Sequence, residues 1–390
     1  MEPELTATHP PPERPEIVSV ANAPGLAAAL QTLGLDLLFE WEGRVFILAA
    51  AEDIRTLNKA RIPYLSESHK FPALDPQPLH ILGGINGDYH SAAELEADLQ
   101  TLEHAFPQLA RLSTIGISLE NRNIYALKIS DNVGQDEEEA EVLFLGCHHA
   151  REWISVEVPY LLARFLLENY ASDPVVRRAV DLSEIWIVPL VNPDGLEYSI
   201  RFYRYWRKNR RLNPDGTYGV DLNRNYGYNW AYDDRGSSPE PASDVYRGEA
   251  PFSEPESRAV RDLFFQRDFQ ALVSYHSYSQ VILYPWGFTT APTDQDGLLE
   301  SLAASMSDLM RAVNGRIYGF GRAGDSLYLT NGDTTDWAFG VAGISAFTIE
   351  LPPVDQLGGG FFNAEADIGP IFRENVPAAL ALIDWSIGNF

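Results

Sequence analysis

A histidine and a glutamate three positions apart carry the clearest chemical potential in this sequence. His149 and Glu152 follow the apolar run at 143–147 and open a second apolar stretch that we expect to be helical. Residues three apart on a helix share one face, so an imidazole and a carboxylate at this spacing can converge on one ion. Together with a third histidine and one open position, they would form a catalytic zinc site.

The third ligand is sought among the histidines that follow His149 in the chain. His276 is the only one. An isolated histidine at a strand end is usually a hydrogen-bonded structural residue, and it is the preceding pair that favours a ligand here. His148 is an alternative to His149, but only His149 stands three residues before Glu152. Cys147 could also bind zinc, although we interpret it as the buried end of the strand.

The elements that must position these residues alternate between strands and helices from residue 92 onward. This alternation predicts an α/β fold with a mixed, mostly parallel central sheet and helices on both faces. Ligands of such sheets collect at the carboxyl ends of the strands, where His149 and His276 both fall. The expected strands are near 124–130, 142–147, 185–191, 271–275 and 346–351, and the expected helices are near 92–102, 152–170, 256–265, 298–313 and 376–383.

A smaller unit precedes this domain. Residues 1–15 are rich in proline and are predicted to form a disordered tail. Residues 16–66 predict a small ferredoxin-like α+β domain that supplies no catalytic cluster. Residues 67–87 are expected to be an exposed linker, of the kind that proteases cut, and residues 88–390 the catalytic domain. Within the small domain, strands are expected at 17–20, 36–41, 44–48 and 63–65, and helices at 24–33 and 51–58.

Composition limits the classes of function. The chain of 390 residues has a formal net charge of −26 and one cysteine. Repulsion from polyanions argues against nucleic acid and anionic membranes as partners, and no apolar run of about eighteen residues predicts a transmembrane helix. One cysteine excludes an internal disulfide framework. The start of the chain is acidic and polar, so no export signal is visible.

Cations cluster in one stretch of this acidic chain. Residues 201–211 read RFYRYWRKNRR, and residues 221–225 add an arginine between two asparagines. Planar guanidinium groups bind carboxylates through two parallel hydrogen bonds, so these stretches indicate an anionic substrate group or a charged transition state. The alternative is a solvated surface loop.

Six motifs, in this order, resemble the zinc metallocarboxypeptidases related to pancreatic carboxypeptidases A and B. The resemblance covers roughly residues 88–390, and the residues flanking Tyr328 resemble the bacterial carboxypeptidase T branch most closely. In several members of the family an N-terminal domain of this size is an inhibitory propeptide, which is what residues 16–66 resemble. The six motifs are HAREWI at 149–154, NPDG at 192–195, RYWRKNR at 204–210, DLNRN at 221–225, YHSYS at 275–279 and FTIEL at 347–351.

Carried over residue by residue, the resemblance implies a zinc-dependent exopeptidase. It makes His149, Glu152 and His276 the ligands of one zinc ion, with a water in the fourth position. Glu350 becomes the general base, and Arg207 polarises the scissile carbonyl. The remaining assignments are Asn223, Arg224 and Tyr328 for the substrate's terminal carboxylate, Arg151 and Arg204 for secondary contacts, and Asp221 for orienting the ring of His149.

Two residues of the 328–337 segment bear on side-chain preference. Thr335 stands where the resemblance puts an apolar residue in enzymes that prefer hydrophobic ends and an aspartate in those that prefer lysine or arginine. Asp333 could face a cationic side chain at the rim of the pocket, or it could be only a turn residue. We therefore expect a mixed hydrophobic and basic preference, as carboxypeptidase T shows.

Two other functions would use the same scaffold. An amidase acting on cell-wall peptides, or a deacylase of acylated amino acids, would leave the terminal-carboxylate residues unpaired. An inactive binding protein would have no need of Glu350 and Arg207. The partners implied are therefore peptide or protein C-termini and, for a zymogen, an activating protease that cuts near Arg61 or Lys70. A monomer is expected, and the resemblance favours secretion.

Overall fold

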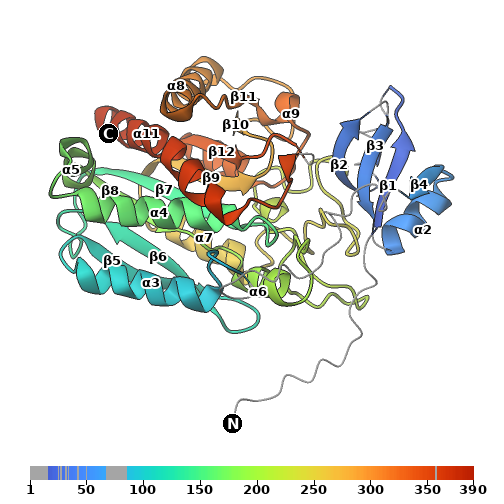
Figure 1. Ribbon diagram of the computed structural model, residues 1–390, viewed down its shortest axis with the longest axis horizontal. Coiled ribbons are helices and arrows are strands. Elements are labelled where there is room, and N and C mark those ends of the chain that lie inside the picture. Colours follow the sequence, from blue (N-terminus) through green and yellow to red (C-terminus); the bar gives the residue numbers. More distant parts are fainter. Residues whose placement is uncertain are drawn as a thin grey trace, which may run out of the picture. The chain divides into compact units, whose positions relative to one another are not determined.

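The computed structural model describes residues 16–66 and 86–390, except 25, 27–28, 31–32, 34, 42–43, 50 and 356–357. The chain forms two compact units, which divide between Gln77 and Pro78 (Figure 1). This division falls inside the predicted linker. The predicted tail at 1–15 and most of the linker lie outside the described residues.

The N-terminal unit is built on an antiparallel sheet with the strand order β2-β3-β1-β4. Its hydrophobic core includes Val18 and Val20 of β1 and Val45 and Ile47 of β3, because residues two apart on a strand point to the same face. The predicted helix at 24–33 falls partly outside the described residues. The elements are β1 (Glu16–Ala21), β2 (Asp36–Trp41), β3 (Arg44–Ala49), α2 (Ala51–Lys59) and β4 (Tyr64–Ser66).

The larger unit contains an eight-stranded mixed sheet with the order β11-β10-β12-β9-β7-β8-β6-β5. The four central strands, β12, β9, β7 and β8, run parallel to one another. The prediction of an α/β fold with a mixed, mostly parallel sheet is therefore confirmed. The strands are β5 (Ala110–Ile117), β6 (Asn123–Ile129), β7 (Ala140–Gly146), β8 (Ser183–Val188), β9 (Phe269–Ser277), β10 (Val281–Tyr284), β11 (Gly319–Arg322) and β12 (Ser345–Leu351).

Helices pack on this sheet and bury its central strands. Every residue of β7 and of β12 is buried, which requires cover on both faces. Figure 1 shows α4 and α11 in front of the sheet and α7 behind it. The helical segments are α3 (Ala92–Ala105), α4 (Ile154–Asn169), α5 (Pro174–Asp181), α6 (Pro193–Arg201), the 3₁₀ turn η3 (Leu222–Arg224), α7 (Pro255–Phe265), α8 (Asp296–Asn314), α9 (Ala323–Ser326), α10 (Thr334–Ala342) and α11 (Glu365–Asn389).

The helix expected to begin at Glu152 begins two residues later, at Ile154. His149 and Glu152 therefore share the turn between β7 and α4 rather than one face of a helix. Cys147 starts this turn in the left-handed region, with φ of 53°. The turn is closed by a bond from the Glu152 N–H to the carbonyl of His149, at 3.2 Å.

The other predicted strands and helices of the larger unit are present with shifted ends. β8 is shorter than the expected 185–191 because Pro189 has no N–H with which to extend the ladder. Seven further elements were not predicted from the sequence: β5, β10, β11, α5, α6, α9 and α10. None of the helices in the described part of the chain is both long and apolar enough to cross a membrane.

Candidate metal centre

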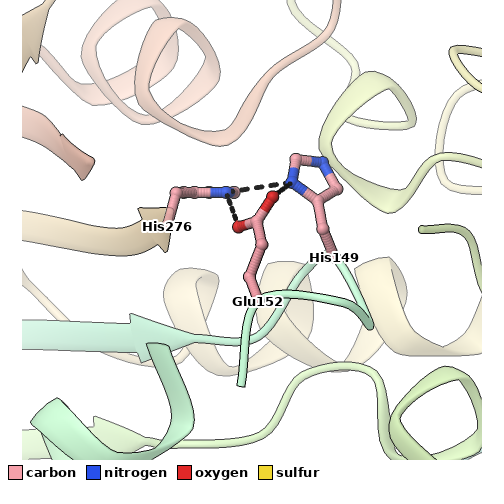
Figure 2. A group of neighbouring side chains, drawn as sticks. All are labelled: His149, Glu152 and His276. Atoms are coloured by element: carbon pink, nitrogen blue, oxygen red, sulfur yellow. Dashed lines mark hydrogen bonds and ion pairs between the residues drawn. The ribbon is translucent and has the colours of Figure 1, made fainter. Parts of the chain in front are cut away.

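Figure 2 shows that the side chains of His149, Glu152 and His276 turn toward one point. The Nδ1 atom of His149 lies 2.8 Å from Oε1 of Glu152, and Nδ1 of His276 lies 3.1 Å from Oε2 of the same carboxylate. The two Nδ1 atoms are 3.1 Å apart. All three residues are at least 96% buried, with exposed fractions of 4%, 2% and 1%.

The parallel sheet brings these residues together from distant parts of the sequence. His149 and Glu152 follow β7, and His276 lies near the end of β9, the strand next to it. In the ladder Gly146 pairs with Tyr275. Because both strands run in the same direction, their carboxyl ends meet at one edge, where such sheets bind ligands.

The second nitrogen of each imidazole ring is also held. Nε2 of His149 lies 3.1 Å from Oδ1 of Asp221, and Nε2 of His276 lies 3.0 Å from Oγ of Ser274. Partners of this kind fix the orientation and the tautomer of a histidine that binds a metal through its other nitrogen. Two imidazole nitrogens and one carboxylate oxygen directed at one point are a donor set that fits zinc.

Burial and charge set the protonation of this donor set. Burial alone would raise the pKa of Glu152, but His149 and His276 beside it hold the pKa below its ordinary value. Burial lowers the pKa of His276, more than the Glu152 carboxylate raises it. An ionised carboxylate and a neutral imidazole are the forms that bind metal ions.

Asp221 links the imidazole of His149 to Arg207. Its Oδ2 accepts hydrogen bonds from Nε and Nη2 of Arg207 at 3.0 and 2.8 Å. Burial would raise the pKa of Asp221, but Arg207 and His149 hold it well below its usual range. Nη1 of Arg207 lies 4.0 Å from Oε1 of Glu152, so the guanidinium lies beside the three candidate ligands.

The 3₁₀ turn η3 carries two of the three residues expected to hold a substrate carboxylate. Asp221 caps this turn, accepting the N–H of Asn223 at 3.0 Å. Nη1 of Arg224 donates to the carbonyl of Asn223 at 2.7 Å, and its guanidinium carbon lies 5.9 Å from the ring centroid of Tyr328. The structure therefore brings Asn223, Arg224 and Tyr328 together. Nδ2 of Asn223 lies 3.4 Å from Nε2 of His276, so this group adjoins the candidate metal centre.

Glu350 lies on β12, in register with His276 of β9. It is 8% exposed. Burial and the neighbouring Glu152 carboxylate raise its pKa well above the ordinary value, and Arg207 and Arg224 oppose this rise. The expected general base therefore stands among the expected ligands and the expected substrate residues.

The two remaining arginines contact aromatic rings. The guanidinium of Arg204 lies 3.7 Å from a ring centroid of Trp153 and donates to the carbonyls of Arg151 and Phe361 at 2.5 and 2.6 Å. Two of its three nitrogens are thus bonded to backbone carbonyls. Arg151 is 2% exposed and lies 4.0 Å from the ring centroid of Phe361.

Asp333 caps α10. Its Oδ1 accepts the N–H of Asp336 and the hydroxyl of Thr335, both at 2.8 Å, and its Oδ2 accepts the hydroxyl of Thr330 at 2.6 Å. Asp333 therefore does serve as a turn residue, which was one of the two roles considered for it from the sequence. Asp333 is also 4% exposed, and among the described residues no basic side chain forms an ion pair with it. Burial and Asp333 raise the pKa of Asp336 well above its usual range.

Reasoning from the sequence missed two hydroxyl residues at this site. Ser274 contacts His276, and Thr334 donates to Oδ1 of Asn223 at 2.8 Å. Strand alternation could have found Ser274, because a residue two positions before His276 lies on the same face of the sheet. The sequence holds no comparable signal for Thr334, whose position depends on where the loop before α10 is placed.

The sequence and structural comparisons agree with this geometry. Residues 95–378 match the family described as zinc carboxypeptidase, and the chain belongs to that family. It is a metallocarboxypeptidase, an exopeptidase that acts on the C-termini of peptides.

The relatives extend over most of the chain. Carboxypeptidase B of Astacus astacus is 36% identical over 293 residues, which cover 73% of this chain and 93% of the relative. A zinc carboxypeptidase of Saccharothrix mutabilis subsp. capreolus is 32% identical over 398 residues, covering 96% of this chain and 89% of the relative. The crystal structure of thrombin activatable fibrinolysis inhibitor has a TM-score of 0.78 and 25% identity, over 96% of this chain and 99% of that chain.

Proposed function

We propose that this metallocarboxypeptidase uses one zinc ion, held by His149, Glu152 and His276, to release apolar, aromatic and basic residues from peptide C-termini. We further propose that it is made as a zymogen. The observation that carries the first proposal is the convergence of three buried donor side chains beside the group formed by Asn223 and Arg224.

When bound, zinc supplies a Lewis acid and a nucleophilic water at neutral pH. The protein's own residues do the rest. Asp221 fixes the ring of His149 so that Nδ1 faces the other ligands. The carboxylate of Glu350 takes a proton from the attacking water and passes it to the leaving amine nitrogen. The guanidinium of Arg207, held in place by Asp221, stabilises the negative charge that develops on the carbonyl oxygen.

The restriction to the last peptide bond comes from the recognition of a free carboxylate. Arg224 uses Nε and Nη1 for the carbonyls of Gly236 and Asn223, which leaves Nη2 for a substrate. Asn223 has its amide oxygen bound by Thr334, which leaves its amide hydrogens. Two such donors fix the register of a peptide so that only its final bond reaches the metal. A substrate without a terminal carboxylate would leave these buried donors unpaired.

The mixed preference is supported by the surroundings of α10. Thr335 supplies a small side chain with its hydroxyl bound to Asp333, so the hydroxyl does not need a polar partner from the substrate. Asp333 adds a buried carboxylate without a basic partner among the described residues. A cationic side chain of a substrate would balance this charge, while an apolar side chain would meet a wall whose hydrogen bonds are already formed.

The zymogen proposal rests on the separate N-terminal unit. It has its own hydrophobic core, which includes Val18, Ile47 and Leu57. The matches to the Saccharothrix relative and to the thrombin activatable fibrinolysis inhibitor each cover 96% of this chain, so each includes this unit. Cleavage near Lys70, in the linker, would separate the unit from the catalytic domain, whereas a cut at Arg61 would fall inside the unit, before β4.

The test is the release of C-terminal amino acids from peptides that end in Leu, Phe, Arg or Glu, and from the same peptides with amidated C-termini. Intact and linker-cut protein are compared, with and without a zinc chelator. We expect chelator-sensitive release of Leu, Phe and Arg, none from amidated peptides, and faster release after cutting. A strict preference for Glu would refute the proposed specificity, and full activity of the intact chain would refute the zymogen. Loss of release in the variant Glu350→Gln, with unchanged zinc binding, would show that Glu350 acts as the base and is not a zinc ligand.

A further inference from the structure

His148 is fully buried, lies next to His149 and has no part in the reaction described above. Its ring stacks on that of His276, with centroids 5.5 Å apart and planes at 11°. Nδ1 of His148 lies 3.2 Å from Oγ of Ser274. Nε2 lies 2.8 Å from the hydroxyl of Tyr226 and 3.1 Å from that of Thr334. Each ring nitrogen of this histidine thus meets hydroxyl groups.

The hydroxyl groups continue to the two halves of the site. Oγ of Ser274 lies 3.0 Å from Nε2 of His276, the proposed zinc ligand. The hydroxyl of Thr334 donates at 2.8 Å to Oδ1 of Asn223, the proposed substrate contact. A continuous chain of buried side chains therefore joins His276 to Asn223 through His148.

The direction of these hydrogen bonds can be fixed from the Asn223 end. The backbone N–H of Thr334 can only donate, and it meets Oδ1 of Asn223 at 2.9 Å, so this atom is the amide oxygen. The Thr334 hydroxyl gives its only hydrogen to the same oxygen, so in its 3.1 Å contact with Nε2 of His148 it can only accept. Nε2 of His148 then carries the proton, and Nδ1 accepts from Ser274.

The metal end gives the same direction independently. A ring nitrogen that binds a metal carries no proton, and Nδ1 of His276 faces Glu152. Nε2 of His276 therefore carries the proton and donates to Ser274, whose own hydroxyl hydrogen is free for Nδ1 of His148. With Nδ1 accepting from Ser274 and Nε2 donating toward Thr334, the His148 ring offers one acceptor and one donor, which is the pattern of a neutral imidazole.

We propose that His148 is a positioning residue that sets, through Ser274 and Thr334, both the tautomer of His276 and the orientation of the Asn223 amide. This inference rests on the proposed function, in which His276 is a zinc ligand and Asn223 is a substrate contact. In this order of protons, Nδ2 of Asn223 and Nε2 of His276 both carry hydrogen, so their 3.4 Å contact is not a hydrogen bond. The amide hydrogens of Asn223 are left for the substrate carboxylate. The affinity for zinc and the affinity for substrate thereby both depend on His148, a side chain that contacts neither the zinc nor the substrate.

The first test is the tautomer of His148, measured by nitrogen-15 NMR on protein labelled at histidine, with and without zinc. We expect the proton on Nε2 of His148 in both forms. A proton on Nδ1 would overturn the proposal. This measurement decides the direction of the hydrogen bonds that run from His276 through His148 to Asn223, which we call the relay. It does so even if the protein releases no amino acid, so failure of the proposed function and failure of the relay give different results.

The second test uses variants to separate two arms: the link from His148 through Ser274 to His276, and the link from His148 through Thr334 to Asn223. Ser274→Ala is expected to raise the zinc dissociation constant by about 10–100-fold, the usual effect of losing a partner of a ligand, with KM unchanged. Thr334→Val is expected to raise KM several-fold with the zinc dissociation constant unchanged, and Thr334→Ser to restore it. His148→Phe keeps a flat ring but breaks both arms, so both quantities should change. Ser386→Ala, which removes a buried hydroxyl bonded within α11, is the control and should change neither.

Wild-type zinc binding and chelator-sensitive release are measured first, because their absence would refute the proposed function itself. With these established, a His148→Phe variant that changes neither the zinc dissociation constant nor KM, or only one of them, would overturn the relay. A purely structural role would lower the melting temperature and leave both quantities as they are. Should His148→Phe not fold, the wild-type tautomer remains the deciding measurement.

Discussion

Replacing Asp221 by asparagine tests the link between the metal centre and Arg207. In the native protein Oδ1 accepts from Nε2 of His149 and from the N–H of Asn223, and Oδ2 accepts two bonds from Arg207. An asparagine has only one acceptor oxygen, so either His149 or Arg207 must face an NH₂ group. The shape of the side chain is kept, while one charge and one acceptor are lost.

The magnitude follows from burial. Arg207 is 6% exposed and Asp221 is 0% exposed, so the substitution removes the charged partner that bonds two nitrogens of a buried guanidinium. Removing one partner of a buried pair costs about 3–5 kcal/mol of folding stability. Loss of the partner of a metal-binding histidine weakens metal affinity by about 10–100-fold, or about 1.4–2.8 kcal/mol.

The pH dependence of this variant has a defined sign. The folded-state pKa of Asp221 is depressed, so the carboxylate stabilises the native state above its unfolded pKa of about 3.9, and this stability is lost as pH falls toward the folded value. Asp221→Asn should therefore be less stable than the native protein at pH 7, with the difference shrinking in acid.

The assays are urea unfolding at pH 7 and at pH values below the unfolded pKa of about 3.9, and zinc affinity by competition with a chelator. Asp384→Asn, which removes an exposed ion pair with Arg178, is the control and should change stability by less than about 1 kcal/mol. Unchanged zinc affinity in Asp221→Asn would refute the role assigned to Asp221 at His149. Unchanged stability would refute the buried pairing with Arg207.

Three further predictions concern other parts of the larger unit. Burial would lower the pKa of His90, but Glu157 and Asp98 raise it to about 9. Below pH 6.5 the variant His90→Gln should therefore be less stable than the native protein, and above pH 9 the two should be equally stable. Melting curves at one pH in each range test this prediction. In Gly146→Ala the new Cβ would lie 2.1 Å from a backbone oxygen, so we expect destabilisation of more than about 4 kcal/mol, measured by urea unfolding. The control is Gly297→Ala in α8, where open space surrounds the new Cβ, and it should be neutral or stabilising. Asp333→Asn should lower kcat/KM for peptides ending in Arg relative to those ending in Leu by about tenfold, and an unchanged ratio would show that Asp333 serves only as the cap of α10.

Much of the site could be predicted from the sequence because its chemistry is local. The spacing of His149 and Glu152, and the single histidine downstream of them, fixed three candidate ligands without any structure. The apolar runs placed most central strands and helices, since fully buried parallel strands are continuous in hydrophobic residues. The less buried strands at the edges of the sheet, such as β5 and β11, lack this signal and were missed.

What the sequence determined by itself is the set of reactive residues, the order of the central elements and the separation of a small N-terminal unit from the catalytic domain. Only the tertiary structure decided how distant residues share one site: Asp221 between His149 and Arg207, Glu350 in register with His276, and the chain through His148. The physical reason is that hydrogen bonds between distant segments depend on strand pairing and loop placement, which leave no periodic pattern in the sequence.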